Sequence, residues 1–394
     1  MDATEVTPFR IDIPDADLAD LHERLARTRW PDELPGVGWD YGIPLGYVRE
    51  LAEYWRTAYD WRAYEARLNE FDQFTTTIDG TNVHFLHVRS PEPSAVPLLV
   101  THGWPGSVAE FLKVLGPLTD PAAHGGDPAD AFHVVAPSIP GYGFSGPTTE
   151  TGWDVGRVAT AFGELMTRLG YDRFAVHGGD WGAMISRETG VRHPERVLGV
   201  HLTMLPTGVQ RSKPTKQDLE GLSEADQKQL VTSYERTIQF QSSGAGYGML
   251  QSTRPQTLAY GLADSPTGQL AWITEKFKEW TDSTDRPEDA VDRDQLLTNV
   301  SIYWLTGTAG SSARLYYETA HAGRGWGGPP PPASTVPTGV AVFPKELSLP
   351  VRRLAERSDN IVHWTEFEHG GHFAAMEQPE ALVGDIRTFF RTLR

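Results

Sequence analysis

The segment from 173 to 182, RFAVHGGDWG, constrains the fold most, because it joins a short apolar strand to a sharp turn of small residues. The turn displays one carboxylate, that of Asp180, between Gly178 and Gly182. A strained strand-to-helix turn needs small residues two positions before and after its centre, since the backbone is crowded there. The segment therefore has the pattern of a nucleophile elbow that carries aspartate. A carboxylate in this position attacks an electrophilic carbon and leaves an ester on the protein, whereas a serine would indicate acyl transfer.

A second turn, upstream of the first, supplies backbone donors for such a reaction. Residues 97–100, PLLV, are predicted to form a buried strand, and the turn 101–107, THGWPGS, follows directly. From this position a backbone N–H group can point at the reacting carboxyl group. We therefore expect the N–H groups of Trp104 and Trp181 to form an oxyanion hole that stabilises developing negative charge.

The predicted base and acid come from the C-terminal part of the chain. Residues 361–367, IVHWTEF, are expected to form a strand, and His372 follows a glycine pair just beyond it. We predict that His372 is the base, because nucleophile, acid and histidine then follow one another in the order expected of such a site. Glu346 is the predicted acid, since it lies just past the expected strand 339–343. Asp359 is the alternative acid.

The order of the predicted elements indicates an α/β-hydrolase fold with a mainly parallel central sheet. Further strands are expected at 83–88, 132–135 and 196–200. A helix over 158–169 has its apolar residues three or four positions apart. Strands that alternate with such helices are typical of a parallel sheet.

The chain has 394 residues, more than one such core requires, so additional segments are expected. We predict an N-terminal lead segment over 1–73, which carries two amphipathic patterns and packs on the core. The core is expected to comprise 74–206 and 325–394, and the helical pattern of 207–324 predicts a lid over the active site. The run 327–332, GGPPPP, is interpreted as a stiff return linker, with a polyproline recognition segment as the alternative.

The formal net charge of −17 argues against nucleic acid or an anionic membrane surface as a partner. The sequence has no apolar stretch of membrane-spanning length and no signal-peptide core at its start, which predicts a soluble, cytoplasmic protein. It has no cysteine, and its 13 histidines are scattered without metal-ligand spacing. No phosphate-binding glycine loop is present. We therefore expect no metal and no cofactor.

Several short motifs, taken together, closely resemble those of the microsomal-type epoxide hydrolases. They are HGWPGS at 102–107, GGDWG at 178–182, FPKE at 343–346, GGHF at 370–373, and RWP and GWDYG in the lead segment at 29–31 and 38–42. The last two are similar to the N-terminal region typical of that family, so the resemblance covers nearly the whole chain. Two positions depart from the family pattern: His177 stands where glutamine is frequent, and Ala183 where serine is frequent.

The resemblance also implies two lid tyrosines that hold an epoxide oxygen. Tyr247 and Tyr316 occupy the matching positions, and Tyr317 is a neighbour that could be mistaken for Tyr316. Both matching residues would then bind the substrate together with Trp104 and Trp181. Tyrosines on lid helices otherwise serve as packing residues, as most tyrosines do.

The function implied by the resemblance is hydrolysis of a small-molecule epoxide to a vicinal diol through a covalent aspartyl ester. Two alternatives are a haloalkane dehalogenase, which also uses an aspartate elbow, and a non-catalytic binding protein with the same fold. The many aromatic residues favour a bulky aryl or polycyclic epoxide. An intermediate of antibiotic biosynthesis is one candidate of this kind. A homodimer is an open alternative to a monomer.

Overall fold

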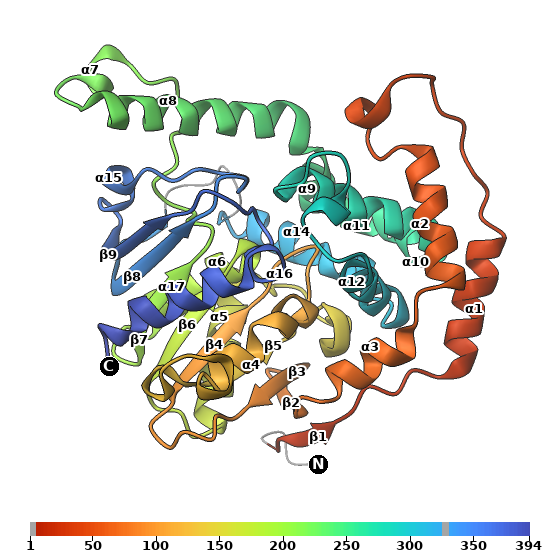
Figure 1. Ribbon diagram of the computed structural model, residues 1–394, viewed down its shortest axis with the longest axis horizontal. Helices are drawn as coiled ribbons and strands as arrows, with labels where there is room; N and C mark the ends of the chain where they lie inside the picture. The colour runs from red at the N-terminus through yellow and green to blue at the C-terminus, as the bar shows by residue number, and fades with distance from the viewer. Residues whose placement is uncertain (1–4, 325–330) are drawn as a thin grey trace.

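The computed structural model describes residues 5–324 and 331–394, which form one mixed sheet surrounded by helices (Figure 1). The expected linker 327–332 begins outside the described residues, as does the expected core boundary at 325. The strands are β1 (Thr7–Phe9), β2 (Gln73–Ile78), β3 (Thr81–Val88), β4 (Val96–Thr101), β5 (Phe132–Pro137), β6 (Phe174–Gly178), β7 (Val197–Leu202), β8 (Ser334–Val342) and β9 (Asp359–Glu366).

The helices of the described residues fall into three groups along the chain. The lead segment forms α1 (Asp15–Ala26), α2 (Leu45–Thr57) and α3 (Trp61–Leu68). The core helices are α4 (Leu115–Thr119), α5 (Val155–Arg168), α6 (Asp180–Arg192), α15 (Arg352–Ala355), α16 (Ala374–Glu377) and α17 (Pro379–Arg391). The region predicted to form a lid, 207–324, contains α7 (Lys216–Leu219), α8 (Glu224–Gln239), α9 (Gly246–Thr253), α10 (Pro255–Asp264), α11 (Pro266–Trp280), α12 (Arg293–Leu305), α13 (Ala309–Ser312) and α14 (Arg314–His321).

The sheet of the described residues has the strand order β1-β2-β3-β5-β4-β6-β7-β8-β9. β1, β2, β3 and β5 pair antiparallel, and all pairs from β5 to β9 are parallel. The sheet is thus mainly parallel, as predicted. Apolar residues of α4 and α17 pack on one face, and those of α5 and α6 pack on the other. The apolar strands are covered on both faces, which explains their continuous hydrophobic runs.

The lead segment reaches both the sheet and the lid, whereas the sequence placed it simply on the core. Its strand β1 pairs with β2 at the edge of the sheet. Its helices lie beside the lid at the right of Figure 1. There the indole of Trp55 donates a hydrogen bond of 2.9 Å to Ser301, and Tyr59 pairs with Thr298 at 2.9 Å. Aromatic residues with polar tips therefore join the lead segment to α12.

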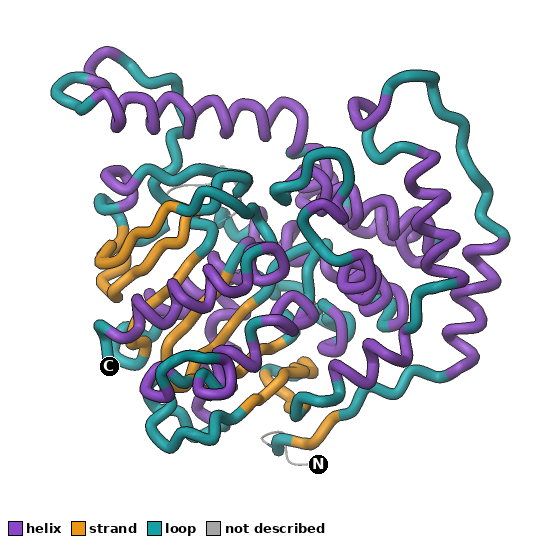
Figure 2. Tube along the Cα trace, in the orientation of Figure 1, coloured by secondary structure: helices purple, strands orange, loops and turns teal. Residues whose placement is uncertain are grey.

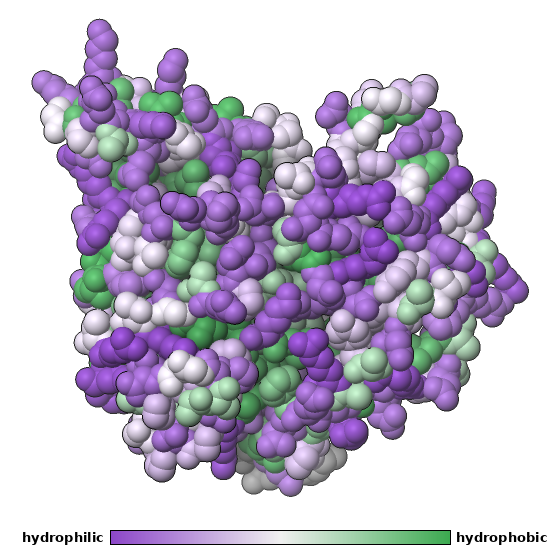
Figure 3. Space-filling view, in the orientation of Figure 1, coloured by the Kyte–Doolittle hydropathy of each residue, from purple (hydrophilic) through white to green (hydrophobic). Residues whose placement is uncertain are grey.

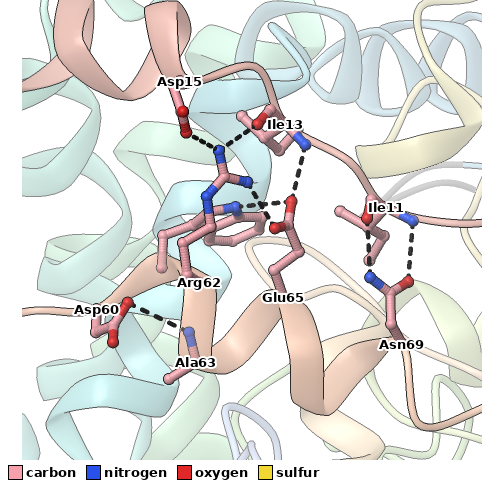
Figure 4. Close-up of polar contacts among 9 residues, drawn as sticks. Ile11, Ile13, Asp15, Asp60, Arg62, Ala63, Glu65 and Asn69 are labelled. Atoms are coloured by element: carbon pink, nitrogen blue, oxygen red, sulfur yellow. Dashed lines mark hydrogen bonds and ion pairs between the residues drawn. The ribbon is translucent and has the colours of Figure 1, made fainter.

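A network of polar contacts fixes the chain between β1 and α1 (Figure 4). Glu65 of α3 accepts hydrogen bonds from the backbone of Ile13 at 2.8 Å and from Arg62 at 2.6 Å. Asn69 bonds both the N–H and the C=O of Ile11, at 3.0 and 2.8 Å. These contacts satisfy backbone groups of an extended segment that has no partner strand of its own.

The surface seen in Figure 3 is largely hydrophilic, with hydrophobic residues scattered among polar ones. Helix α8, at the upper left of Figure 2, extends away from the rest of the lid. Among the described residues, the structure has no helix whose length and apolar character would suit a membrane crossing.

Candidate active site

The elbow is built as the sequence predicts, with β6 ending at Gly178 and α6 beginning at Asp180. Asp180 has a φ of 49°, a left-handed conformation that is strained for a residue with a side chain. A Cβ on Gly178 would lie 2.2 Å from the carbonyl oxygen of Gly182, and a Cβ on Gly182 would lie 1.9 Å from that of Thr101. The close approach of the backbone therefore requires glycine at both positions.

The structure brings the predicted base and acid together beside Asp180. The Nδ1 of His372 is 2.6 Å from Oε1 of Glu346, and its Nε2 is 3.5 Å from Oδ2 of Asp180. All three side chains are buried. Asp359, the alternative acid, instead forms an ion pair of 2.7 Å with Arg187 and takes no part in this contact.

Electrostatics make the imidazole of His372 strongly basic. Burial by itself lowers the pKa of His372, but the charge of Glu346, the hydrogen bond to Glu346 and the nearby carboxylate of Asp180 raise it well above its ordinary value. Two supports hold this histidine in place. Its backbone N–H donates to the carbonyl of Trp280 at 2.8 Å, and Glu377 accepts from the N–H of the next residue at 3.0 Å.

Helix α8, in the region predicted to form the lid, holds the loop that carries Glu346. The guanidinium of Arg236, on α8, donates to the carbonyls of Glu346 and Pro344 at 2.8 and 3.1 Å. The backbone N–H of Leu347 donates to Oε1 of Glu346 at 2.6 Å. The position of Glu346, the predicted acid, is thus set by α8 as well as by its own loop.

The turn after β4 lies directly against Asp180. The backbone N–H of Trp104 donates to Oδ1 of Asp180 at 2.7 Å. A Cβ on Gly103 would lie 2.3 Å from the Asp180 side chain, so the turn can approach this closely only with glycine there. Trp181, the other predicted donor, occupies the first turn of α6 and is fully buried.

The two lid tyrosines face each other across this site. Tyr247 of α9 stacks on Trp104 with ring centroids 5.0 Å apart, and Tyr316 of α14 meets Trp181 edge-on at 4.6 Å. The two tyrosine rings are 5.9 Å apart. Burial, and then neighbouring groups that include Asp180, raise the pKa of both phenols well above the ordinary value, so they remain protonated. Tyr317 instead stacks on His321 at 3.8 Å.

Three residues of α12 that the sequence analysis missed hold the turn in place. Gln295, Asn299 and Tyr303, spaced four positions apart, donate to the carbonyls of the turn and of its following helix. The acceptors are Ala109 at 3.1 Å, Pro105 at 2.7 Å and Gly106 at 2.6 Å. Their spacing places them on one helix face, and this polar stripe was the only signal in the sequence.

Asn299→Ala should lower kcat/KM by about tenfold, because it leaves the Pro105 carbonyl without its donor and loosens the Trp104 turn. Steady-state kinetics on a folded variant measure this effect. Asn360→Ala is the matched control, since Asn360 also donates to a backbone carbonyl, that of Thr335 at 3.1 Å, outside the site. Equal losses of activity in the two variants would contradict a role for α12 in positioning the turn.

Both residues that depart from the expected family pattern are buried. His177 pairs with His201 at 2.9 Å between Nδ1 atoms, within the sheet. Ala183 is fully buried in α6. In the part of the chain that the structure describes, no group of three or more His, Asp or Glu side chains could hold a metal ion.

Comparison with known proteins identifies the family of this chain. Residues 6–111 match the family model described as epoxide hydrolase N terminus, and residues 96–327 match that of the alpha/beta hydrolase fold. The chain is 37% identical to epoxide hydrolase 1 of Sus scrofa, across 98% of this chain and 89% of the relative. The chain belongs to the microsomal-type epoxide hydrolase family. A protein of Stigmatella aurantiaca named "Putative epoxide hydrolase" is 47% identical across 99% of this chain and 86% of its own length.

Solved structures agree with this assignment. The epoxide hydrolase of Aspergillus niger matches with a TM-score of 0.85 at 32% identity, across 99% of this chain and 97% of that chain. The juvenile hormone epoxide hydrolase of Bombyx mori matches with a TM-score of 0.82 at 30% identity, across 99% and 94%. The predicted α/β-hydrolase fold is confirmed, and so is the predicted class of enzyme: the protein is an epoxide hydrolase.

Proposed function

We propose that this enzyme converts its epoxide to a vicinal diol through an ester on Asp180. The observation that carries the proposal is the placement of one buried carboxylate among three kinds of group. A base, His372, is 3.5 Å away, the N–H of Trp104 is 2.7 Å away, and two protonated phenols lie against the neighbouring tryptophans. This set contains a nucleophile, a proton donor, a base and an oxyanion donor.

Ring opening is the first step of the proposed mechanism. The Asp180 carboxylate attacks a ring carbon, a new C–O bond forms, and the bond from that carbon to the epoxide oxygen breaks. The oxygen becomes more basic as its bond breaks, and it takes a proton from Tyr247 or Tyr316. Because these phenols have raised pKa values, they hold their protons until an alkoxide develops.

Hydrolysis of the ester is the second step. His372, oriented by Glu346, takes a proton from water, and the water oxygen attacks the carbonyl carbon of the ester. The N–H groups of Trp104 and Trp181 stabilise the resulting oxyanion, and its collapse releases the diol. Esterification removes the charge of Asp180, one of the influences that raise the pKa of His372, so the imidazole can act as a base in this step.

The substrate we propose is a bulky aryl or polycyclic epoxide, among them intermediates of antibiotic biosynthesis. The support for this is the aromatic character of the site. The ring centroid of Trp104 lies 5.0 Å from that of Tyr247, 5.9 Å from that of Tyr316 and 6.3 Å from that of Trp280. Such surfaces favour flat, apolar ligands.

A screen of aryl, aliphatic and polycyclic epoxides, with chiral analysis of the diols, tests the proposal. We expect diol from all active substrates and the highest kcat/KM for aryl and polycyclic compounds. A preference for short aliphatic epoxides would contradict the proposed substrate class. Chloride release from haloalkanes, without diol from any epoxide, would contradict the proposed reaction and favour a dehalogenase.

We also propose that the enzyme acts in the cytoplasm, without a metal or cofactor. The proposed organisation is a lead segment over 1–73, a core of 74–206 and 325–394, and a lid over 207–324. The net charge of −17 supports the absence of an anionic membrane partner. Cell fractionation tests the location, and light scattering distinguishes a monomer from a homodimer.

The lid tyrosines are tested by single and double replacements. Tyr247→Phe and Tyr316→Phe should each slow ester formation by at least about tenfold, because each removes one of two proton donors to the same oxygen. The double variant should be nearly inactive. Its fold-reduction in the rate of ester formation should differ from the product of the two single fold-reductions. Rapid-quench measurement of ester formation gives these rates.

Tyr317→Phe is the matched control for these variants. Tyr317 neighbours Tyr316 in the chain but packs on His321, so its replacement should leave ester formation within about twofold of the wild-type rate. A large effect of Tyr317→Phe with none of Tyr316→Phe would show that the assignment is wrong by one residue.

A further inference from the structure

One carboxyl group close to the site, that of Glu110, has no role in the mechanism above. Glu110 lies in η2 (Val108–Lys113), the short helix that follows the Trp104 turn. Its neighbours Ala109 and Phe111 are buried, whereas Glu110 keeps part of its surface accessible.

The turn is shaped around this carboxyl group. A Cβ on Gly106 would lie 1.3 Å from Oε1 of Glu110, so only glycine leaves room for the carboxyl. The backbone N–H groups of Gly103 and Ser107 face the carboxyl and favour its charged form. Since Gly103 also packs on Asp180, one short turn contacts both carboxyl groups.

The charges around Glu110 are those of the reacting groups. Burial raises the pKa of Glu110 to about 8, the charge of His372 lowers it, and the charge of Asp180 raises it. Tyr303 is a further titratable neighbour, and its hydroxyl donates to the Gly106 carbonyl at 2.6 Å. Esterification of Asp180 removes a negative charge, which lowers the pKa of Glu110 and favours its carboxylate in the intermediate.

We propose that Glu110 positions the water that hydrolyses the ester on Asp180, an inference that rests on the function proposed above. The water needs two acceptors to fix its orientation. One of its hydrogens points to Nε2 of His372 and the other to the Glu110 carboxyl, which leaves a lone pair directed at the ester carbonyl carbon.

The proton balance of the step leaves Glu110 unchanged. The O–H bond directed at His372 breaks as the water oxygen bonds to the carbonyl carbon, and the imidazole keeps that proton. The bond from this carbon to the diol oxygen then breaks, and the diol oxygen takes a proton from the imidazolium. The other hydrogen of the water remains on the Asp180 carboxyl group, whose proton returns to the phenolate left by ring opening, so that both the carboxylate and the phenol are restored. Glu110 only accepts a hydrogen bond throughout, so it acts as a water-positioning residue.

Glu110→Gln, in single turnovers of styrene oxide, separates the two chemical steps. Rapid acid quench with mass spectrometry of the Asp180 peptide measures ester formation and ester decay. We expect ester formation within twofold of wild type and ester decay slowed by tenfold or more, because only the second step uses the water. Both kcat and KM should therefore fall in the steady state.

Glu164→Gln is the matched control, the same change at an exposed position of α5, and it should alter neither step. Glu110→Ala, which leaves room for an extra water, should likewise slow ester decay and leave ester formation unchanged. It replaces Glu110→Gln in the experiment if Glu110→Gln does not fold. Unchanged ester decay in a folded Glu110 variant, or equal slowing of both steps, would overturn the inference. The absence of both ester and diol in the wild-type enzyme would instead overturn the proposed function itself.

Discussion

Asp180→Asn is expected to lower kcat/KM by at least about 10⁴-fold, because an amide cannot act as the nucleophile that forms the ester. Asparagine is the most conservative replacement available. It tolerates the left-handed conformation of this position, where φ is 49°, and it keeps an acceptor for the N–H of Trp104. The fold should therefore survive while the chemistry is lost. Diol formation and thermal unfolding, measured on the same preparation, check both parts.

Asp359→Asn is the informative companion to this variant. Asp359 is also a buried carboxylate, but it pairs with Arg187 at 2.7 Å instead of with His372. Breaking a buried pair typically costs about 3–5 kcal/mol of folding stability, so this variant should be destabilised yet keep its activity per folded molecule. Near-normal diol formation by Asp180→Asn would rule out the ester mechanism. A catalytic collapse of folded Asp359→Asn would revive Asp359 as the acid.

The features that the sequence predicted are those decided by local backbone geometry. Gly178 and Gly182 mark the elbow because a Cβ on either would clash with the backbone packed against it, and the two glycines are visible in five consecutive residues. The Trp104 turn and the loop of His372 are also short motifs beside apolar strands. Strands covered on both faces are continuous apolar runs, which is why the parallel part of the sheet could be predicted.

The features that the sequence did not predict depend on contacts between distant segments. The edge strand β1 is only three residues long and shows no periodicity, so nothing in its sequence indicated that it pairs with β2. Glu346 and Asp359 both follow the elbow in the chain, and only the fold shows that one contacts His372 and the other Arg187. Glu110 lies in an apolar stretch, and its proximity to His372 exists only after folding.

His372→Gln should allow ring opening but block hydrolysis, so the ester on Asp180 should accumulate. Glutamine cannot take the proton from water, and we expect ester decay to slow by at least about 10³-fold. His369→Gln is the matched control, because His369 lies in the same loop but is exposed. Mass spectrometry of the Asp180 peptide should show the added substrate mass in His372→Gln and not in His369→Gln.

Oxygen labelling then identifies the attacking atom, since a direct attack by water would give the same diol. In one turnover of excess wild-type enzyme in heavy-oxygen water, the oxygen added to the product comes from the Asp180 carboxylate. The first diol should therefore be unlabelled, and the Asp180 peptide should carry the heavy oxygen, because water cleaves the ester at its carbonyl carbon. Label in the first diol would mean that water attacks the epoxide itself, with Asp180 as its general base. The two experiments must give the same answer about the ester. If His372→Gln accumulates ester on Asp180, the wild-type enzyme must carry the heavy oxygen in Asp180, because both results require the same covalent bond.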